Sequence, residues 1–319
     1  MNEKKRPVII FDTDMDTDVD DAGALTILLN AVKAGRIELD GIIVDVPDSC
    51  AAAACKVLCM RAGMEVPIGT IYMSEFPQNE TDRYVRYRHH RTTLPANIYY
   101  NRTAAKMLGK CDRDYPHATE VYRRLLSGAE DQSVIITAVG FLTAIEQLWQ
   151  SGPDEISPLD GYELFRKKVK CVVSMGDAAY PLCLSSNFNY NMDRVGAKAF
   201  FDRCPCPVCI SPDGIRVITG GTFSASLAEG DPLRIFYEIY NEGPFRGRMS
   251  WDLIAVLYAI DPENPLFEKE THGKVCYDDR ENRTYWDEYS DLRQDWLIHT
   301  TVPPEETAKI LEGLMISGF

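Results

Sequence analysis

Six aspartates lie within ten residues near the start of the chain, between an apolar segment and a segment of helix length: Asp12, Asp14, Asp16, Asp18, Asp20 and Asp21. So many carboxylates in one turn repel each other unless a cation neutralises them or some of them are protonated. Their oxygen atoms suit a hard divalent cation such as Ca²⁺ or Mg²⁺. Helix capping explains one or two aspartates at a helix start, but not six.

Two known carboxylate motifs can be compared with this turn. An EF-hand loop needs Gly at its sixth position, which holds Thr17 when the loop starts at Asp12, so an EF-hand is excluded. A haloacid-dehalogenase-type phosphatase also begins with a strand ending in Asp-x-Asp, with Asp12 as nucleophile and Asp14 as acid. Its later acidic motif is not evident, because Pro181 stands where a second aspartate would follow Asp177. The phosphatase stays open as an alternative.

Short apolar runs rich in β-branched residues recur along the chain and predict buried strands at residues 8–11, 42–44, 66–68, 134–138, 169–173 and 208–210. Segments with helical periodicity lie between several of them, at residues 20–33, 51–61, 141–149 and 194–201. This alternation predicts an α/β, Rossmann-like fold in which helices flank a mostly parallel central sheet. Ligands in such folds bind beyond the carboxyl ends of the strands.

The remaining segments extend this pattern. Residues 72–115 show no clean periodicity, which is typical of a functional loop or of small inserted helices. A helical block is expected from residue 233, a hairpin at 273–286 and a closing helix at 304–315. A chain of 319 residues without a linker or an internal repeat fits one domain spanning residues 1–319.

Charge and hydropathy exclude two classes of partner. The chain has 34 Lys and Arg against 48 Asp and Glu, a net charge of -14, so a nucleic acid would be repelled. The apolar run that follows the basic N-terminal residues is too short for a signal peptide, and no later window reaches the length of a membrane-spanning helix. We therefore expect a cytoplasmic protein that binds neither nucleic acid nor membrane.

Ten cysteines are scattered along the chain without the spacing of a disulfide framework, so we expect reduced and mostly buried thiols. Cys204, Cys206 and Cys209 offer three thiolates that zinc could use. A fourth ligand is not evident nearby, so the sequence disfavours a zinc site.

The acidic turn resembles the N-terminal signature of the inosine-uridine preferring nucleoside hydrolase family, Asp-x-Asp-x-Gly-x-Asp-Asp-Ala. Asp12 and Asp14 match its start, and Asp20, Asp21 and Ala22 match its end. Two extra residues lie between, and Asp16 stands where Gly is usual.

Three later segments resemble the same family in the same order, so that the resemblance runs from Val8 to about Pro262. Residues 134–143 resemble the strand and turn whose backbone carbonyl binds calcium. Residues 187–193 resemble the ribose-binding Glu-Phe-Asn motif, with Asn187 in place of Glu. Residues 250–262 resemble the helix that brings the last calcium carboxylate.

The resemblance implies calcium-dependent hydrolysis of the N-glycosidic bond of a ribonucleoside, giving free base and ribose. It implies that Asp14 is a calcium ligand and the general base. Asp21, Asp252 and the carbonyl of Val139 would complete the calcium ligands. The family commonly forms dimers or tetramers, so a homo-oligomer is also implied.

By the same resemblance, Asp20 orients the sugar, and the side chains of Asn187, Asn189 and Asp48 bind its hydroxyls. Trp251 would face the base and favour a purine. Taken singly, Asn187 and Asn189 could instead form turns, and Asp252 could cap a helix.

Two points stay open. No histidine matches a leaving-group acid, because His89 and His90 lie in the irregular basic segment. The replacement of Glu by Asn187 removes a negative charge that would help an oxocarbenium-like sugar. The alternative is a homologue that binds calcium and a ribosyl ligand with little or no nucleoside hydrolysis.

Overall fold

The computed structural model describes residues 5–15, 17–47, 50–92, 99–109, 115–177, 187–290 and 293–319. The side chains of residues 82 and 88–92 lie outside this description. Asp16 and Asp48, two residues of interest in the sequence, therefore lie outside the described residues.

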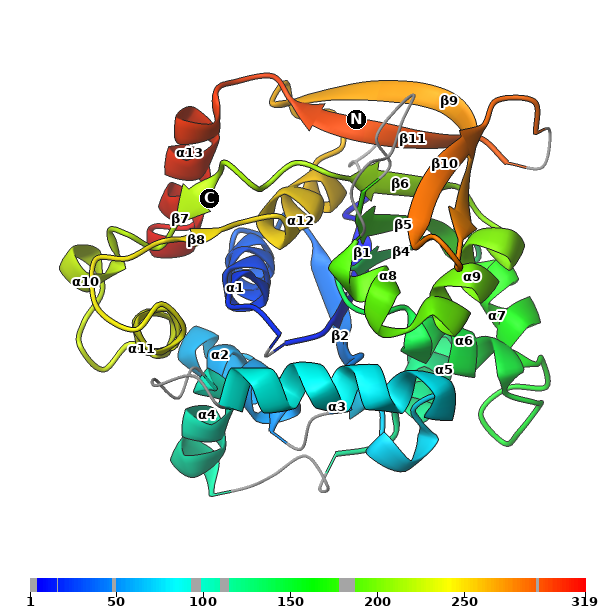
Figure 1. Ribbon diagram of the computed structural model, residues 1–319, viewed down its shortest axis with the longest axis horizontal. Helices are drawn as coiled ribbons and strands as arrows, with labels where there is room; N and C mark the ends of the chain where they lie inside the picture. Colours follow the sequence, from blue (N-terminus) through cyan, green and yellow to red (C-terminus); the bar gives the residue numbers. More distant parts are fainter. Residues whose placement is uncertain are drawn as a thin grey trace.

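Nine strands among the described residues form one sheet, in the order β10-β9-β11-β6-β5-β4-β1-β2-β3 (Figure 1). The strands from β11 to β3 in this order pair in parallel, whereas β9 is antiparallel to both β11 and β10. The bounds are β1 (Val8–Thr13), β2 (Glu38–Val44), β3 (Ile68–Thr70), β4 (Val134–Ala138), β5 (Val169–Met175), β6 (Val208–Ser211), β9 (Phe267–Asp278), β10 (Arg283–Asp287) and β11 (Asp295–Thr300). A separate antiparallel pair joins β7 (Ile218–Thr219) to β8 (Arg248–Met249).

Helices cover both faces of the sheet. On one face α1 (Asp20–Lys33) packs against α2 (Ala51–Ala62), α12 (Asp252–Ile260) and α13 (Pro304–Ile316) (Figure 1). On the other face α6 (Thr143–Gln150) packs against α5 (Ala118–Gly128), α7 (Gly161–Lys168) and α9 (Arg194–Arg203). The remaining helical segments are η1 (Met73–Glu75), α3 (Gln78–Thr92), α4 (Tyr100–Leu108), α8 (Phe188–Met192), α10 (Phe223–Ser226) and α11 (Pro232–Tyr240). This coverage explains the continuous apolar runs, since strands such as β1 and β4 are buried along almost their whole length.

The strand order reverses next to β1, and this reversal places the site. The chain runs outward from β1 to β2 and β3, then returns to place β4, β5 and β6 on the other side. The carboxyl ends of β1 and β4 therefore flank a topological switch point, where loops diverge and leave a crevice. Asp14 follows β1 and Val139 follows β4 directly.

The predicted fold is confirmed, and several element predictions needed adjustment. The strand expected at 66–68 lies two residues later, as β3, and the helix expected at 141–149 begins at Thr143. The hairpin at 273–286 is confirmed by the pairing of β9 with β10. Helices α5 and α7 were not predicted, and the irregular stretch at 72–115 contains η1, α3 and α4. The sequence of α3 is so polar that it lacks an apolar stripe, so the spacing of apolar residues does not indicate a helix there.

Six of the eight described cysteines are buried. Within the same ranges no helix combines the length and the apolar character needed to cross a membrane.

Candidate active site

A cavity of about 490 Å³ opens at the switch point. This volume lies within the range of about 300–1,000 Å³ that is common for small-molecule sites. Its described lining residues are Asp14, Thr17, Asp18, Asp20, Asp21, Tyr87, Val139, Met175, Gly176, Asp177, Asn187, Phe188, Asn189, Pro212, Tyr240, Arg248, Trp251 and Asp252. Of the predicted site residues, the cavity therefore brings together all except Asp48, which lies outside the described residues.

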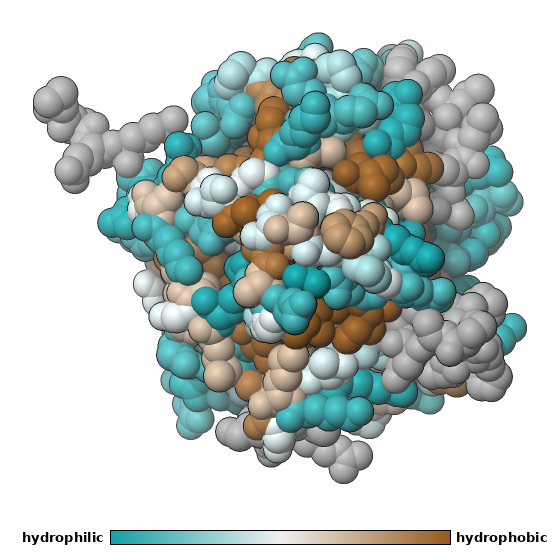
Figure 2. Space-filling model, turned by 90° about the vertical axis from the view of Figure 1, so that its left-hand side faces the viewer, coloured by the Kyte–Doolittle hydropathy of each residue, from teal (hydrophilic) through white to brown (hydrophobic). Residues whose placement is uncertain are grey.

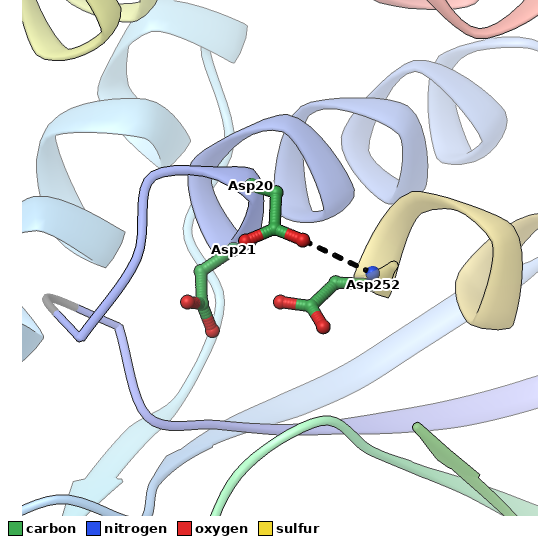
Figure 3. Close-up of side chains that lie close together, drawn as sticks. All are labelled: Asp20, Asp21 and Asp252. Atoms are coloured by element: carbon green, nitrogen blue, oxygen red, sulfur yellow. Dashed lines mark hydrogen bonds between the residues drawn. The ribbon is translucent and has the colours of Figure 1, made fainter. Parts of the chain in front are cut away.

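Three buried carboxylates converge at one end of the cavity. Asp20 and Asp21 begin α1, and Asp252 begins the neighbouring helix α12. A carboxylate oxygen from each lies within 4.8 Å of the other two, and no other group of three such ligands occurs among the described residues. Figure 3 shows the side chains of Asp21 and Asp252 pointing toward a shared space beside Asp20. We call Asp14, Asp20, Asp21 and Asp252 the carboxylate end of the cavity.

Hydrogen bonds fix two of these carboxylates. Oδ2 of Asp20 accepts from the backbone N–H groups of Trp251 (2.9 Å) and Asp252 (3.3 Å), so Asp20 links the starts of α1 and α12 (Figure 3). The Thr13 hydroxyl donates to Oδ1 of Asp21. Oδ2 of Asp21 is buried and has no hydrogen-bond partner among the described residues. A buried acceptor without a partner is costly, and a cation would satisfy it.

Asp14 and Val139 are held at the ends of β1 and β4. The Thr17 hydroxyl donates to Oδ2 of Asp14, and the side-chain amide of Asn189 donates to the carbonyl oxygen of Val139. The next residue along, Gly140, lies so close to β1 that an added Cβ would meet the backbone nitrogen of Asp14 at 2.9 Å. Glycine therefore permits the close approach of the two turns that form the floor of the cavity.

The carboxylate end is electrostatically strained without a cation. Burial raises the pKa of Asp14 to about 7, although its hydrogen bond with Thr17 acts in the opposite direction. Burial, followed by repulsion from neighbouring aspartates, raises the pKa values of Asp20, Asp21 and Asp252 well above the ordinary range. Four crowded carboxylates and one backbone carbonyl form an all-oxygen donor set, which fits a hard divalent cation.

Capping does not explain why these aspartates converge, although Asp20 accepts from the first N–H groups of α12. The N-cap of α1 is Val19, which makes no side-chain capping bond, and Asp252 lies inside α12 rather than at its N-cap. Asn187, in contrast, is the N-cap of α8: its side-chain oxygen accepts from the N–H of Tyr190 (3.0 Å). The side-chain nitrogen of Asn187 lies 3.6 Å from the sulfur of Met175 at the cavity wall.

The cavity is also lined by aromatic side chains from separate elements, with one arginine among them. We call Tyr87, Phe188, Tyr240, Arg248 and Trp251 the aromatic end. The rings of Tyr87 and Phe188 have centroids 4.9 Å apart. The guanidinium carbon of Arg248 lies 5.4 Å from the ring centroid of Tyr240 and 5.8 Å from that of Trp251.

Asp12 and Asp45 form a second acidic pair behind the cavity wall. Both are fully buried; the Tyr122 hydroxyl donates to Asp12, and Oδ1 of Asp45 accepts from the N–H of Ala144 (3.1 Å). Burial raises the pKa of Asp12 to about 7 and, together with repulsion from Asp12, raises that of Asp45 well above its usual range. Asp12 is not among the lining residues, which argues against its role as a phosphatase nucleophile. Sequence reasoning missed Asp45, although it directly follows β2.

The cysteine cluster forms no comparable site. The sulfur atoms of Cys204 and Cys206 lie 3.7 Å apart in a buried position. Neither they nor Cys209 belong to a group of three possible metal ligands within the described residues.

The family model described as inosine-uridine preferring nucleoside hydrolase matches residues 9–308. Among curated protein sequences, none matches this chain.

Three solved structures illustrate the similarity in fold. A plant nucleoside hydrolase, the PpNRh1 enzyme, is 16% identical, with a TM-score of 0.68 over 98% of this chain and 100% of that chain. The type III effector XopQ, solved with adenosine diphosphate ribose, is 14% identical, with a TM-score of 0.71 over 99% and 95%. An inosine-uridine preferring nucleoside hydrolase from Bacillus anthracis is 16% identical, with a TM-score of 0.60 over 99% and 100%.

Proposed function

Because the chain belongs to the inosine-uridine preferring nucleoside hydrolase family, we propose that it hydrolyses the N-glycosidic bond of ribonucleosides, with calcium as its cation and purine nucleosides as favoured substrates. One observation carries this proposal: a single cavity joins a buried group of carboxylates to an aromatic end. The carboxylate end suits a cation and a sugar, and the aromatic end suits a planar base.

In the proposed reaction a water oxygen bonds to C1′ of the ribose while the bond from C1′ to the base nitrogen breaks. The electron pair of the broken bond passes to the base. Asp14 takes a proton from the attacking water, because its carboxylate lines the cavity beside the other proposed calcium ligands.

Asp14, Asp21, Asp252 and the Val139 carbonyl would hold the calcium ion. Bound there, calcium would supply Lewis acidity and offset the negative charge of the carboxylates. Thr13 orients the Asp21 carboxylate through its hydroxyl. Asp20 is oriented by the two backbone amides at the start of α12, which leaves its Oδ1 for the sugar.

The sugar hydroxyls would be bound between the carboxylate end and α8. Asn187 and Asn189 line this part of the cavity, and the side-chain nitrogen of Asn187 can donate to a hydroxyl while its oxygen caps α8. Asp48 is proposed to bind the sugar from the segment after β2. The base would then lie at the aromatic end, with Trp251 against its face.

A second candidate function is the binding of a ribosyl ligand without efficient hydrolysis. The similarity in fold to XopQ, whose structure contains adenosine diphosphate ribose, favours keeping it. The two functions predict different base release by the wild-type protein and by its Asp14→Asn variant. In a hydrolase, Asp14→Asn removes base release while ligand binding persists; in a binding protein, wild type already releases no base.

We also propose that the chain forms a homo-oligomer. Three large apolar side chains, Ile215, Ile218 and Phe245, are at least 49% exposed. They lie in or beside the segments that form β7 and β8, and Figure 2 views the side of the molecule on which these strands lie, where hydrophobic and hydrophilic areas alternate. Light scattering of the purified protein would give the mass, and a monomer at all concentrations would contradict this proposal.

The proposed activity is tested by incubating the protein with separate purine and pyrimidine ribonucleosides and measuring free base by chromatography. We expect base release, fastest with purine nucleosides, and an equal amount of reducing sugar. Release of phosphate from phosphate esters without release of base would instead support the phosphatase. Tight binding of ribosyl compounds without base release would support the second candidate.

A further inference from the structure

Arg248 is the one Lys, Arg or His among the described residues that line the cavity. It belongs to β8, three residues before Trp251, and its side chain is 26% exposed. The proposed function gives it no role. A partly buried guanidinium thus lies in the part of the cavity that is proposed to bind the base.

Asp18 fixes the position of Arg248. Nε of Arg248 lies 2.9 Å and 2.8 Å from the two carboxylate oxygens of Asp18, and Nη2 also donates to Asp18. Asp18 is in turn held by the N–H of Val19, which donates to its Oδ1 at 2.6 Å. The turn before α1 is two residues longer than the family signature, and its Asp18 provides a carboxylate that positions Arg248. This carboxylate is distinct from the converging carboxylates of Asp20, Asp21 and Asp252.

Part of the guanidinium is left to bind a ligand. Nη1 of Arg248 makes no hydrogen bond to any residue that the structure describes. A guanidinium can donate two parallel hydrogen bonds to a pair of neighbouring acceptors. The rings of Tyr240 and Trp251 lie beside the guanidinium, so a planar ligand placed against Trp251 would have its edge near Arg248.

The charges favour a neutral ligand edge over an anionic group. Asp18 balances the charge of Arg248, and the other described charged groups of the cavity are the aspartates of the carboxylate end and Asp177. A phosphate at the aromatic end would be repelled by these aspartates. A base with a carbonyl oxygen brings an acceptor without a net charge.

We propose that Arg248, positioned by Asp18, binds the acceptor edge of the leaving base and stabilises the negative charge that develops there. This inference rests on the proposed hydrolysis. As the bond from C1′ breaks, its electron pair passes into the base, and Arg248 keeps its proton while its hydrogen bonds to the base strengthen. The base then takes a proton from solvent, and Asp14 returns the proton of the attacking water to solvent.

A consequence for specificity follows. Hypoxanthine presents a carbonyl acceptor at C6, whereas adenine presents an amino donor at the same position. Two donors facing each other leave both without a partner, so Arg248 should favour inosine over adenosine by about 10-fold or more in kcat/KM.

The test compares two leaving groups on the same sugar. Nitrophenolate departs from nitrophenyl riboside without needing stabilisation, whereas hypoxanthine departing from inosine needs it. We expect Arg248→Met to lower kcat for inosine about 100-fold and kcat for nitrophenyl riboside less than about threefold. Equal losses on both substrates would overturn the proposal, because a merely structural role affects both alike.

Three further variants secure this result. Asp18→Asn should show the same leaving-group pattern with a smaller loss, and Arg248→Lys should recover part of the loss because it keeps the charge but not the fork. Arg246→Met is the matched control, since Arg246 is exposed in the same loop and bonds only to Asn241 within the described residues. If Arg248→Met does not fold, the pattern in Asp18→Asn decides: equal losses on both substrates overturn the proposal.

Failure of this inference can be distinguished from failure of the proposed function. If wild type hydrolyses neither inosine nor nitrophenyl riboside, the proposed function fails. Calorimetric titration with free hypoxanthine and free adenine then tests Arg248 by itself. Weaker binding of hypoxanthine by Arg248→Met, with adenine unchanged, supports its contact with the base; equal changes, or no hypoxanthine binding by wild type, overturn it.

Discussion

The two ends of the cavity are built in different ways. The carboxylate end comes from the turn after β1 and the starts of two adjacent helices, α1 and α12, around the switch point of the sheet. The aromatic end is assembled from α3, α8, α11, β8 and Trp251, the residue before α12. The topology of the sheet thus fixes the groups assigned to the chemistry, while peripheral elements supply those assigned to recognition of the base.

The sharpest way to separate the two ends is to remove the general base. Asp14→Asn keeps the shape of the side chain but cannot accept the proton, so kcat should fall about 10²- to 10⁴-fold on every substrate, whatever its leaving group. Steady-state kinetics with inosine and nitrophenyl riboside measure this. Asp131→Asn, an exposed site paired with Lys168, is the control and should behave as wild type. A loss of kcat confined to inosine would contradict this role, because it would mean that Asp14 assists the leaving base and not the attacking water.

A smaller effect is expected from the residue behind the carboxylates. Thr13→Val removes the hydroxyl that orients Asp21 but keeps the volume, so calcium affinity should weaken about 10- to 100-fold. Calcium titration by calorimetry checks the affinity, and saturating calcium should restore most of kcat. Unchanged affinity would show that Asp21 does not depend on Thr13 for calcium binding.

The buried aspartates at the carboxylate end and behind the cavity wall should also control how stability depends on pH. Burial raises the pKa values of Asp12 and Asp14 to about 7, so their favourable protonated forms are lost as pH rises toward and through that value. The chelated protein should therefore have a lower Tm at pH 8 than at pH 5, and added calcium should raise Tm more at pH 8. Thermal unfolding monitored by circular dichroism tests this. A Tm of the chelated protein that rises over this range would contradict the strain inferred at this end.

The smallest effect should come from the aromatic end alone. Trp251→Leu removes a ring face but no charge, so kcat/KM for inosine should fall about 2- to 10-fold. Calcium affinity should not change, because the substitution keeps the backbone N–H through which Trp251 donates to Asp20. A parallel loss of calcium binding would mean that the two ends are not separable.

The sequence predicted the carboxylate end better than the aromatic end for a physical reason. Asp14, Asp20 and Asp21 are close in the chain, and strand ends meet at one edge of a parallel sheet, so their convergence follows from local pattern and topology. Asp252 needed the family resemblance, because nothing local distinguishes it from a capping aspartate. Asp45 was accessible to the same rule of strand ends but was passed over in favour of Asp48.

The aromatic end could not be predicted because it depends on how distant elements pack. Tyr87 lies in a polar helix without an apolar stripe, and Tyr240 looks like an ordinary residue of an amphipathic helix. The pairing of Asp18 with Arg248 joins residues 230 positions apart, and no spacing in the sequence indicates it. The sequence alone therefore assigns no role to Asp18.

The most direct test of the central claim is a calcium titration of the chelated protein in which bound calcium and base release from inosine are measured together. We expect one tight equivalent of calcium per chain, with the rate of base release rising in proportion to calcium occupancy. Magnesium should bind more weakly and restore less activity. Magnesium requires nearly octahedral coordination, whereas calcium accepts the irregular arrangement expected of several carboxylates on different loops. Full base release without bound calcium would contradict the claim that the carboxylate end carries the chemistry.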